Sequence, residues 1–178
     1  MKPLVIALVG SKKSGKTTTI ETAIKELTNK GYSVAAVKHV PEPDFTIDSK
    51  GKDTWRFTQS GAKTIIAISA NEIATIEKGA TKDFSLKKIL QKCEGNDVVF
   101  IEGLKNLVGT DKDVQKIVVV KSEKEALRAV KDHEPVLAFV GPYSTKNLNL
   151  KIPYVDILKN PEKIADIIDN LIKKNKTR

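Results

Sequence analysis

One stretch near the start of the sequence limits the possible folds more than any other: Gly10-Ser11-Lys12-Lys13-Ser14-Gly15-Lys16-Thr17. It matches the pattern G-x-x-x-x-G-K-[ST] at every fixed position. An apolar run over residues 3–9 precedes it, and apolar residues at helical spacing follow it over residues 16–29. A buried strand, a glycine-rich loop and a helix, in that order, form the setting in which such a loop binds phosphate.

Each fixed residue of this loop has a physical reason. Gly10 and Gly15 let the backbone adopt unusual angles and approach an oxygen atom closely, so that successive N–H groups form a nest for an anion. The Lys16 ammonium can reach the β- and γ-phosphates, and the Thr17 hydroxyl can bind Mg²⁺. For Lys12 and Lys13, contact with phosphate and simple exposure to solvent remain alternatives. The predicted nucleotide-binding residues are Gly10, Ser11, Lys12, Lys13, Ser14, Gly15, Lys16, Thr17 and Thr18.

The rest of the chain alternates strand and helix patterns, which predicts an α/β fold with a mostly parallel central sheet flanked by helices. Further strands are expected over residues 33–37, 97–101, 116–120 and 136–140, and further helices over 85–92, 123–131 and 161–174. Residues 63–69 and 72–77 predict a small β-hairpin. We expect one P-loop nucleotide-binding domain over residues 1–178, of the P-loop NTPase-like class. The polar segment 40–61 is long for a simple connection, which indicates a function.

Two carboxylates flank the strand predicted over residues 97–101. Open parallel sheets bind ligands at the carboxyl ends of their strands, and Glu102 lies at that end. Asp97 is five residues earlier, roughly 16 Å away, and is expected to cap or end the strand. Glu102 is therefore predicted to serve the metal with Thr17, or to orient a nucleophile, and to be catalytic together with Lys16. The alternative for Glu102 is a structural pair with a lysine such as Lys105.

The end of the strand over residues 33–37 and the polar segment behind it form a second candidate site. Lys38 and His39 follow this strand and should face the same crevice. Residues 48–56 mix both charge signs with a lone Trp55. They form either an anion-binding loop for a second ligand or a solvated connection anchored by Trp55. No cysteine or second histidine accompanies His39, so a metal site there is not expected.

Composition narrows the functional class. The only cysteine, Cys93, excludes an internal disulfide and is expected to be packed, while His133 is expected at the surface. The net charge of +9 fits either a lysine-rich solvated surface or an anionic ligand. With 5% aromatic residues and no nucleic-acid-reading module, a phosphorylated small molecule is favoured. No apolar run approaches the ~20 residues of a membrane span, and no signal peptide is recognisable, so a cytoplasmic protein without membrane or nucleic-acid partners is expected.

Three further segments, together with the loop, resemble a known family. They are Val37-Lys38-His39, then Gly51-Lys52-Asp53-Thr54-Trp55-Arg56 with Ser60-Gly61-Ala62, then Val99-Phe100-Ile101-Glu102-Gly103-Leu104-Lys105. In this order they resemble the MobB family of molybdopterin-guanine dinucleotide biosynthesis. The phosphate loop alone is shared by a vast superfamily, but the Gly-Lys-Asp segment and the Ile-Glu-Gly-Leu-Lys strand end are much more specific.

The resemblance implies a P-loop fold, a homodimer, and binding of GTP with Mg²⁺. It also implies an adaptor role beside a separate molybdenum cofactor guanylyltransferase that attaches GMP to molybdopterin, with weak GTPase activity at most. The residues that it implies on the pterin or second-ligand side are Lys38, His39, Asp48, Lys52, Asp53 and Arg56. Two departures stand out. Residues 40–45 lack the further histidines that members often carry, and Thr145-Lys146-Asn147-Leu148 lacks the aspartate of a guanine-reading motif.

Two other functions compete with this one. A small-metabolite kinase using ATP would need a base for the acceptor hydroxyl and an arginine-rich lid, yet the only arginines are Arg56, Arg128 and Arg178. A GTPase that loads metal onto another protein would need a Cys/His cluster, which the sequence lacks. A slow hydrolase, or a protein that only holds its nucleotide, is therefore predicted.

Overall fold

The structure, a computed structural model, describes residues 2–79, 84–141 and 151–176. Its internal contacts divide the chain into two compact units. The first unit is Met1–His39 together with Ser85–Arg178, and the second unit is Val40–Phe84. That the whole chain acts as one nucleotide-binding domain therefore remains a prediction.

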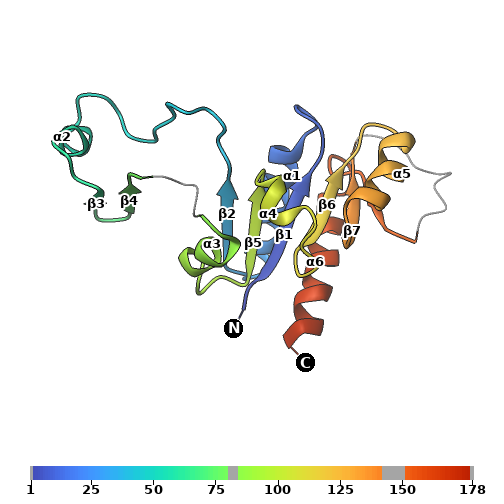
Figure 1. Cartoon of the computed structure of the whole chain (residues 1–178). Coiled ribbons are helices and arrows are strands. Elements are labelled where there is room, and N and C mark those ends of the chain that lie inside the picture. Colours follow the sequence, from blue (N-terminus) through green and yellow to red (C-terminus); the bar gives the residue numbers. More distant parts are fainter. Residues whose placement is uncertain (1, 80–83, 142–150, 177–178) are drawn as a thin grey trace. The chain divides into compact units, whose positions relative to one another are not determined.

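The described residues of the first unit form an α/β structure around one sheet (Figure 1). Its elements are β1 (Leu4–Val9), α1 (Lys16–Asn29), β2 (Val34–Lys38), α3 (Leu86–Lys92), β5 (Val98–Glu102), α4 (Lys105–Val108), β6 (Gln115–Val119), α5 (Glu123–Asp132), β7 (Val136–Val140), β8 (Tyr154–Val155) and α6 (Pro161–Lys176). The predicted α/β class with a mostly parallel sheet is confirmed, and α4 and the two-residue strand β8 are additions to it.

The sheet places β5 between the two other strands that carry the site, β1 and β2. Its order is β2-β5-β1-β6-β7-β8, and every neighbouring pair is parallel. In the register of these pairs, Glu102 of β5 lies beside Leu8 of β1 on one side and Lys38 of β2 on the other. The loop after β1 and the last residues of β2 and β5 therefore meet at the carboxyl edge, where ligands of such sheets bind.

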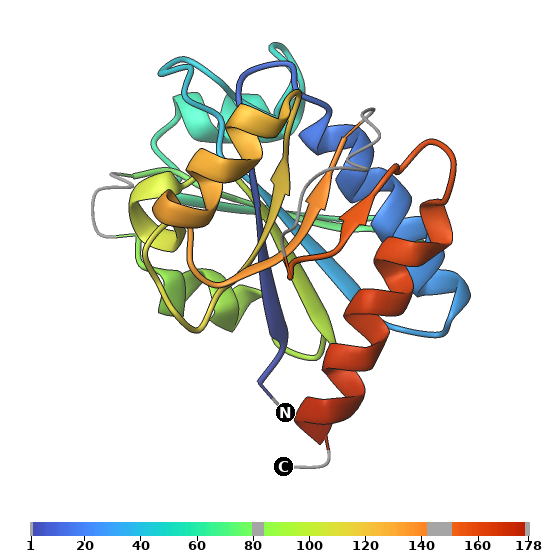
Figure 2. The same ribbon diagram turned by 90° about the vertical axis from the view of Figure 1, so that its right-hand side faces the viewer.

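Helices cover both faces of this sheet, as the apolar pattern on both sides of β1 requires. On one face α1 and α6 lie side by side, and Ile20 and Leu27 pack with Ile164 and Ile168 (Figure 2). On the other face, Ile89 of α3 belongs to a second apolar cluster. Burying each such side chain stabilises the folded state by about 1.5–3 kcal/mol. The edge that carries the site therefore lies on a well-packed core.

The second unit consists of α2 (Asp53–Gln59) and an antiparallel hairpin of β3 (Thr64–Ile68) and β4 (Ile73–Glu77). The hairpin confirms the prediction for residues 63–77. Its two faces differ, because Ile65 is buried whereas Ile66, Ile68 and Ile73 are exposed. Ile68 and Ile73 are cross-strand partners, so these exposed isoleucines lie next to each other on one face.

Three sequence-based expectations about individual segments have clear outcomes. No helix is predicted from the sequence within residues 40–61, but they contain α2, none of whose residues is buried. His133 was expected at the surface, which is wrong: it is 9% exposed at the end of α5, a helix that buries Ala126 and Ala129 on the sheet. Cys93 is packed as expected, and burial raises the pKa of its thiol.

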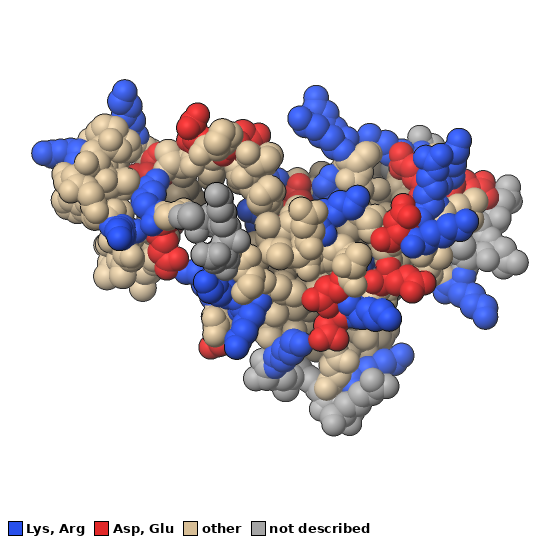
Figure 3. Space-filling model, viewed as in Figure 1, with Lys and Arg blue, Asp and Glu red and all other residues tan. Residues whose placement is uncertain are grey.

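Charged side chains of both signs are spread over the face drawn in Figure 3. On the face drawn in Figure 3, Lys and Arg are interspersed with Asp and Glu, the pattern of a solvated lysine-rich surface. Within residues 2–79, 84–141 and 151–176, no helix combines the length and the apolar character that crossing a membrane demands.

Candidate nucleotide-binding site

The loop between β1 and α1 is shaped by its two glycines. A Cβ atom on Gly10 would lie 2.7 Å from the carbonyl oxygen of Val119 and 2.8 Å from Ser14 Oγ, so a larger residue does not fit there. Gly15 precedes α1 with a left-handed φ of 99°, and Lys13 also has a positive φ of 58°. Left-handed positions alternate with right-handed ones in backbone nests that bind anions, which is the geometry predicted for this loop.

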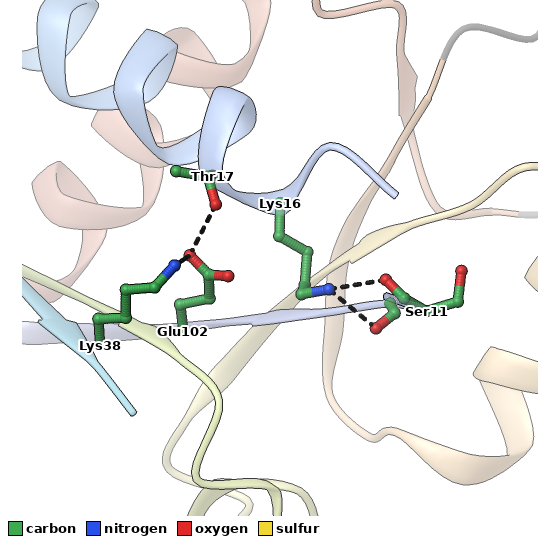
Figure 4. Close-up of polar contacts among 6 residues, drawn as sticks. Ser11, Lys16, Thr17, Lys38 and Glu102 are labelled. Atoms are coloured by element: carbon green, nitrogen blue, oxygen red, sulfur yellow. Dashed lines mark hydrogen bonds and ion pairs between the residues drawn. The ribbon is translucent and has the colours of Figure 1, made fainter. Parts of the chain in front are cut away.

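Lys16 lies across the loop (Figure 4). Its ammonium donates hydrogen bonds to the carbonyl oxygens of Gly10 at 3.1 Å and Ser11 at 2.7 Å. The buried Ser14 hydroxyl has no hydrogen-bond partner among the described residues. A buried polar atom of this kind is costly unless a further group satisfies it, and a phosphate oxygen is suitable for that role. Lys12 and Lys13 are exposed on the same loop, and Thr18 is exposed in the first turn of α1.

Glu102 is the centre of the polar contacts beside the loop (Figure 4). Its Oε2 atom accepts a hydrogen bond from Thr17 Oγ1 at 3.0 Å and another from Lys38 Nζ at 3.1 Å. The predicted metal pair, Thr17 and Glu102, is thus brought into direct contact. The cation beside Glu102 is Lys38, whereas Lys105 had been the alternative from sequence. The signal for this pairing was the placement of both residues at carboxyl ends of strands.

Asp97 has the structural role that its place at the other end of β5 suggested. Its Oδ2 atom accepts a hydrogen bond from the Ser33 backbone N–H at 3.0 Å, and its carbonyl oxygen accepts one from Leu4 N–H at 2.9 Å. Both bonds tie together the amino ends of neighbouring strands. The carboxylate available at the nucleotide edge is therefore that of Glu102.

The residues predicted for a second ligand fall into both units. Lys38 and His39 belong to the first unit, where the His39 backbone N–H donates to the Glu102 carbonyl oxygen at 2.9 Å. Asp48 belongs to the second unit and accepts hydrogen bonds from Ser49 N–H and Thr54 Oγ1, both at 2.8 Å, which hold the chain ahead of α2.

The other three residues of this set, Lys52, Asp53 and Arg56, also belong to the second unit. Arg56 and Asp53 form an exposed ion pair at 3.3 Å, and Lys52 is exposed. Such exposed pairs contribute little to stability, so these side chains can exchange their partners for a ligand at little cost. Their role in binding a second ligand remains a prediction.

The side chains at the carboxyl edge fit a nucleotide with Mg²⁺. The Thr17 hydroxyl and the Glu102 carboxylate supply oxygen atoms, the ligands that Mg²⁺ prefers alongside phosphate oxygens. In the described part of the chain, no three His, Cys, Asp or Glu side chains form a group that could hold a metal ion by themselves. A fold of the P-loop NTPase type generally binds a nucleotide and Mg²⁺ in this way. The segment 145–148, considered for guanine recognition, lies outside the described residues.

Known proteins resemble this chain in sequence and in fold. The family MobB, described as molybdopterin guanine dinucleotide synthesis protein B, matches residues 5–142. A molybdopterin-guanine dinucleotide biosynthesis adapter protein of Haemophilus influenzae is 30% identical, over 93% of this chain and 88% of the relative. A Methanocaldococcus jannaschii protein, provisionally named an adapter of the same kind, is 33% identical over 84% of this chain, and the match spans 60% of that relative's length.

The structural comparison agrees with the sequence comparison. A crystal structure of molybdopterin-guanine biosynthesis protein B (mobB) superposes with a TM-score of 0.72 at 26% identity, covering 96% of this chain and 99% of that one. The family match includes the phosphate loop, the Lys38–Glu102 pair and the whole second unit. The chain therefore belongs to the MobB family.

Proposed function

We propose that this protein is a GTP-binding adapter in the synthesis of molybdopterin guanine dinucleotide. In this role it assists the guanylyltransferase that attaches GMP to molybdopterin, and it works in the cytoplasm. The observation that carries the proposal is the contact of Thr17 with Glu102, at 3.0 Å, next to a phosphate loop whose Lys16 is already held over it. Membership of the MobB family supports the pathway.

The roles of the loop residues follow from their chemistry. The backbone N–H groups of residues 10–18 bind the phosphates, and Lys16 adds a positive charge to them. Thr17 would ligate Mg²⁺ through its hydroxyl oxygen, while Glu102 accepts a hydrogen bond from that hydroxyl and would hold the metal through water. Mg²⁺ supplies neutralisation of the phosphate charge when it is bound.

Hydrolysis by the protein alone is slow in this proposal. Fast phosphoryl transfer needs an arginine or an equivalent cation at the transferred phosphate and a residue that orients the attacking group. Glu102 already accepts hydrogen bonds from Thr17 and Lys38 through Oε2, so this oxygen atom is engaged by the protein itself. We expect turnover far below the 1–10³ per second that is usual for enzymes.

The second unit is assigned to the partners. Molybdopterin is the proposed second ligand, bound by members of the set Lys38, His39, Asp48, Lys52, Asp53 and Arg56. A two-stranded hairpin is only marginally stable alone, and the exposed Ile66, Ile68 and Ile73 give it an apolar face. This face supports a homodimer formed through the second unit.

Calorimetric titration with GTP and with ATP, in Mg²⁺, tests the nucleotide part of the proposal. We expect GTP to bind more tightly, and Lys16→Ala to abolish binding. Lys25→Ala is the matched control, because Lys25 is an exposed lysine on the same helix. A preference for ATP would contradict the adapter role and favour a small-metabolite kinase.

The pathway part needs a separate assay. Purified guanylyltransferase is given molybdopterin and GTP, with or without this protein, and molybdopterin guanine dinucleotide is measured. We expect a higher yield with the wild-type protein than with Lys16→Ala. Equal yields would leave nucleotide binding in place but reject the adapter function.

A further inference from the structure

We propose that Lys38 is a positioning residue that competes with Mg²⁺ for the Glu102 carboxylate, and thereby sets how much Mg²⁺ the protein needs to bind a nucleotide tightly. This inference rests on the proposed nucleotide site. It gives Lys38 a role at the metal in addition to its place in the proposed second-ligand set.

The first observation is that Lys38 and Thr17 use the same oxygen atom. Glu102 Oε2 accepts from Lys38 Nζ at 3.1 Å and from Thr17 Oγ1 at 3.0 Å (Figure 4). The Thr17 hydroxyl is the protein's own metal ligand in this class of loop. The ammonium of Lys38 therefore occupies the same carboxylate oxygen that contacts this metal-ligating hydroxyl.

The second observation is that the backbone fixes this contact. Lys38 and Glu102 are directly paired in the register of β2 with β5, and the next residue, His39, continues the ladder with a 2.9 Å bond to the Glu102 carbonyl oxygen. A Cβ atom on Gly103 would lie only 2.7 Å from His39 Cβ, so the segments that follow β2 and β5 are as close as glycine allows. Neither strand end can shift independently, and Lys38 stays within reach of Glu102.

The third observation is the difference in exposure within the pair. The Glu102 side chain is 17% exposed, whereas that of Lys38 is 58% exposed. A poorly hydrated carboxylate needs a cation, and the exposed lysine can swing into solvent when a better cation arrives. Another lysine at this edge, Lys16, donates to the Gly10 and Ser11 carbonyl oxygens.

Electrostatics then gives the direction of the effect. A monovalent and a divalent cation on one carboxylate repel each other, so Lys38 must be displaced or must weaken Mg²⁺ binding. Removing the charge should therefore lower the Mg²⁺ concentration that gives half of the maximal gain in nucleotide affinity, on the order of tenfold. Binding measured without Mg²⁺ should not become tighter, because the variant loses a positive charge near the phosphates.

The experiment is a titration of nucleotide affinity against Mg²⁺ concentration for four proteins. Wild type is compared with Lys38→Met, which removes the charge, and with Lys38→Arg, which keeps it. Lys87→Met is the control for the change in net charge, since Lys87 is an exposed residue of α3. Thermal unfolding of each variant without nucleotide monitors the fold.

The expected result is a lower Mg²⁺ requirement in Lys38→Met alone, with Lys38→Arg and Lys87→Met like wild type. An unchanged or higher requirement in Lys38→Met would overturn the competition, and a lower requirement in Lys87→Met would reduce it to a net-charge effect. If the wild-type protein binds no nucleotide at any Mg²⁺ concentration, the proposed function fails as well. Wild-type binding with an unaltered Lys38→Met profile rejects the Lys38 role alone.

Discussion

The carboxyl edge of the first unit and the hairpin of the second unit differ in the contacts of their side chains. Polar side chains at the edge are hydrogen-bonded within the unit, whereas apolar side chains of the second unit are mostly exposed. At the edge, Thr17 and Lys38 bond to Glu102, and Lys16 bonds to the loop itself. In the second unit, Ile65 is the one apolar side chain among the described residues that is buried. The large apolar side chains that the second unit exposes are Phe45, Ile47, Phe57, Ile66, Ile68, Ile73 and Phe84. In the proposed function, the first unit carries the nucleotide site within itself, whereas the second unit offers a surface for a partner.

The largest expected effect tests whether the edge is preformed. Gly10→Ala should reduce nucleotide affinity by about a hundredfold or more, because the added Cβ would meet the Val119 carbonyl oxygen at 2.7 Å and displace the loop. Gly15→Ala is the comparison: no atom lies within 4 Å of its added Cβ, but its φ of 99° disfavours alanine. The Gly15→Ala substitution should lower the free energy of unfolding by about 1 kcal/mol. Calorimetry that finds equal affinity for Gly10→Ala and wild type would show that the loop tolerates a different shape.

The next effect tests the apolar face of the hairpin. Ile68→Ser combined with Ile73→Ser should convert the proposed dimer into a monomer, because both side chains are at least 70% exposed and adjacent across the strands. Light scattering coupled to size exclusion measures the mass. Leu158→Ser is the matched control, since Leu158 is 73% exposed in the first unit.

Nucleotide affinity completes this test. The hairpin double variant should bind GTP like the wild type if the two regions act separately. A monomeric double variant that has also lost GTP binding would contradict the view that the first unit carries a complete site. A dimeric double variant would instead assign the dimer to another surface.

A smaller effect separates metal binding from phosphate binding at the edge. Thr17→Val keeps the shape of the side chain but removes the hydroxyl that donates to Glu102 at 3.0 Å. The gain in GTP affinity on adding Mg²⁺ should fall by about tenfold, while affinity in EDTA stays the same. Thr28→Val, at an exposed residue near the other end of the same helix, serves as control. A full Mg²⁺ response in Thr17→Val would remove Thr17 from the metal site.

The smallest effect concerns stability and pH. Burial and then the charge of Lys105 lower the pKa of His133, with a smaller rise from Asp132 and a further lowering from Lys116. Its Nδ1 atom is buried without a partner among the described residues. The folded state therefore binds fewer protons than the unfolded state near and below pH 6.5, so the free energy of unfolding should decrease as pH falls through this value and level off below the folded pKa.

Urea unfolding of the wild type and of His133→Gln at pH 7.5 and pH 5.5 checks this sign. The variant should lose less stability on acidification than the wild type does. An equal loss in both proteins would assign the pH dependence to other groups. Since the hairpin unit contains neither of the two histidines, only the first unit should show the effect.

The parts of the fold and the site that could be predicted from the sequence have a local signal. The loop after β1 and the placement of Glu102 followed from a glycine pattern and an apolar run. The parts that could not be predicted depend on tertiary contacts, which leave no pattern in the sequence. Because α2 buries none of its residues, it leaves no apolar periodicity, and β8 is too short for a pattern. His133 stands in a charged run, yet the packing of α5 buries it. The pairing of Lys38 with Glu102 needs the register of two strands 64 residues apart.

The strand order has a consequence for the order of folding during synthesis. Among the strands that the structure describes, β1 pairs with β5 and β6, and β2 pairs with β5 alone, so neither has a partner until β5 has left the ribosome. The hairpin of β3 and β4 needs only local contacts and precedes β5 in the chain. The nascent chain thus exposes the isoleucines of this hairpin while its first half still lacks a core. At that stage this face is accessible to a chaperone or to the hairpin of a neighbouring nascent chain.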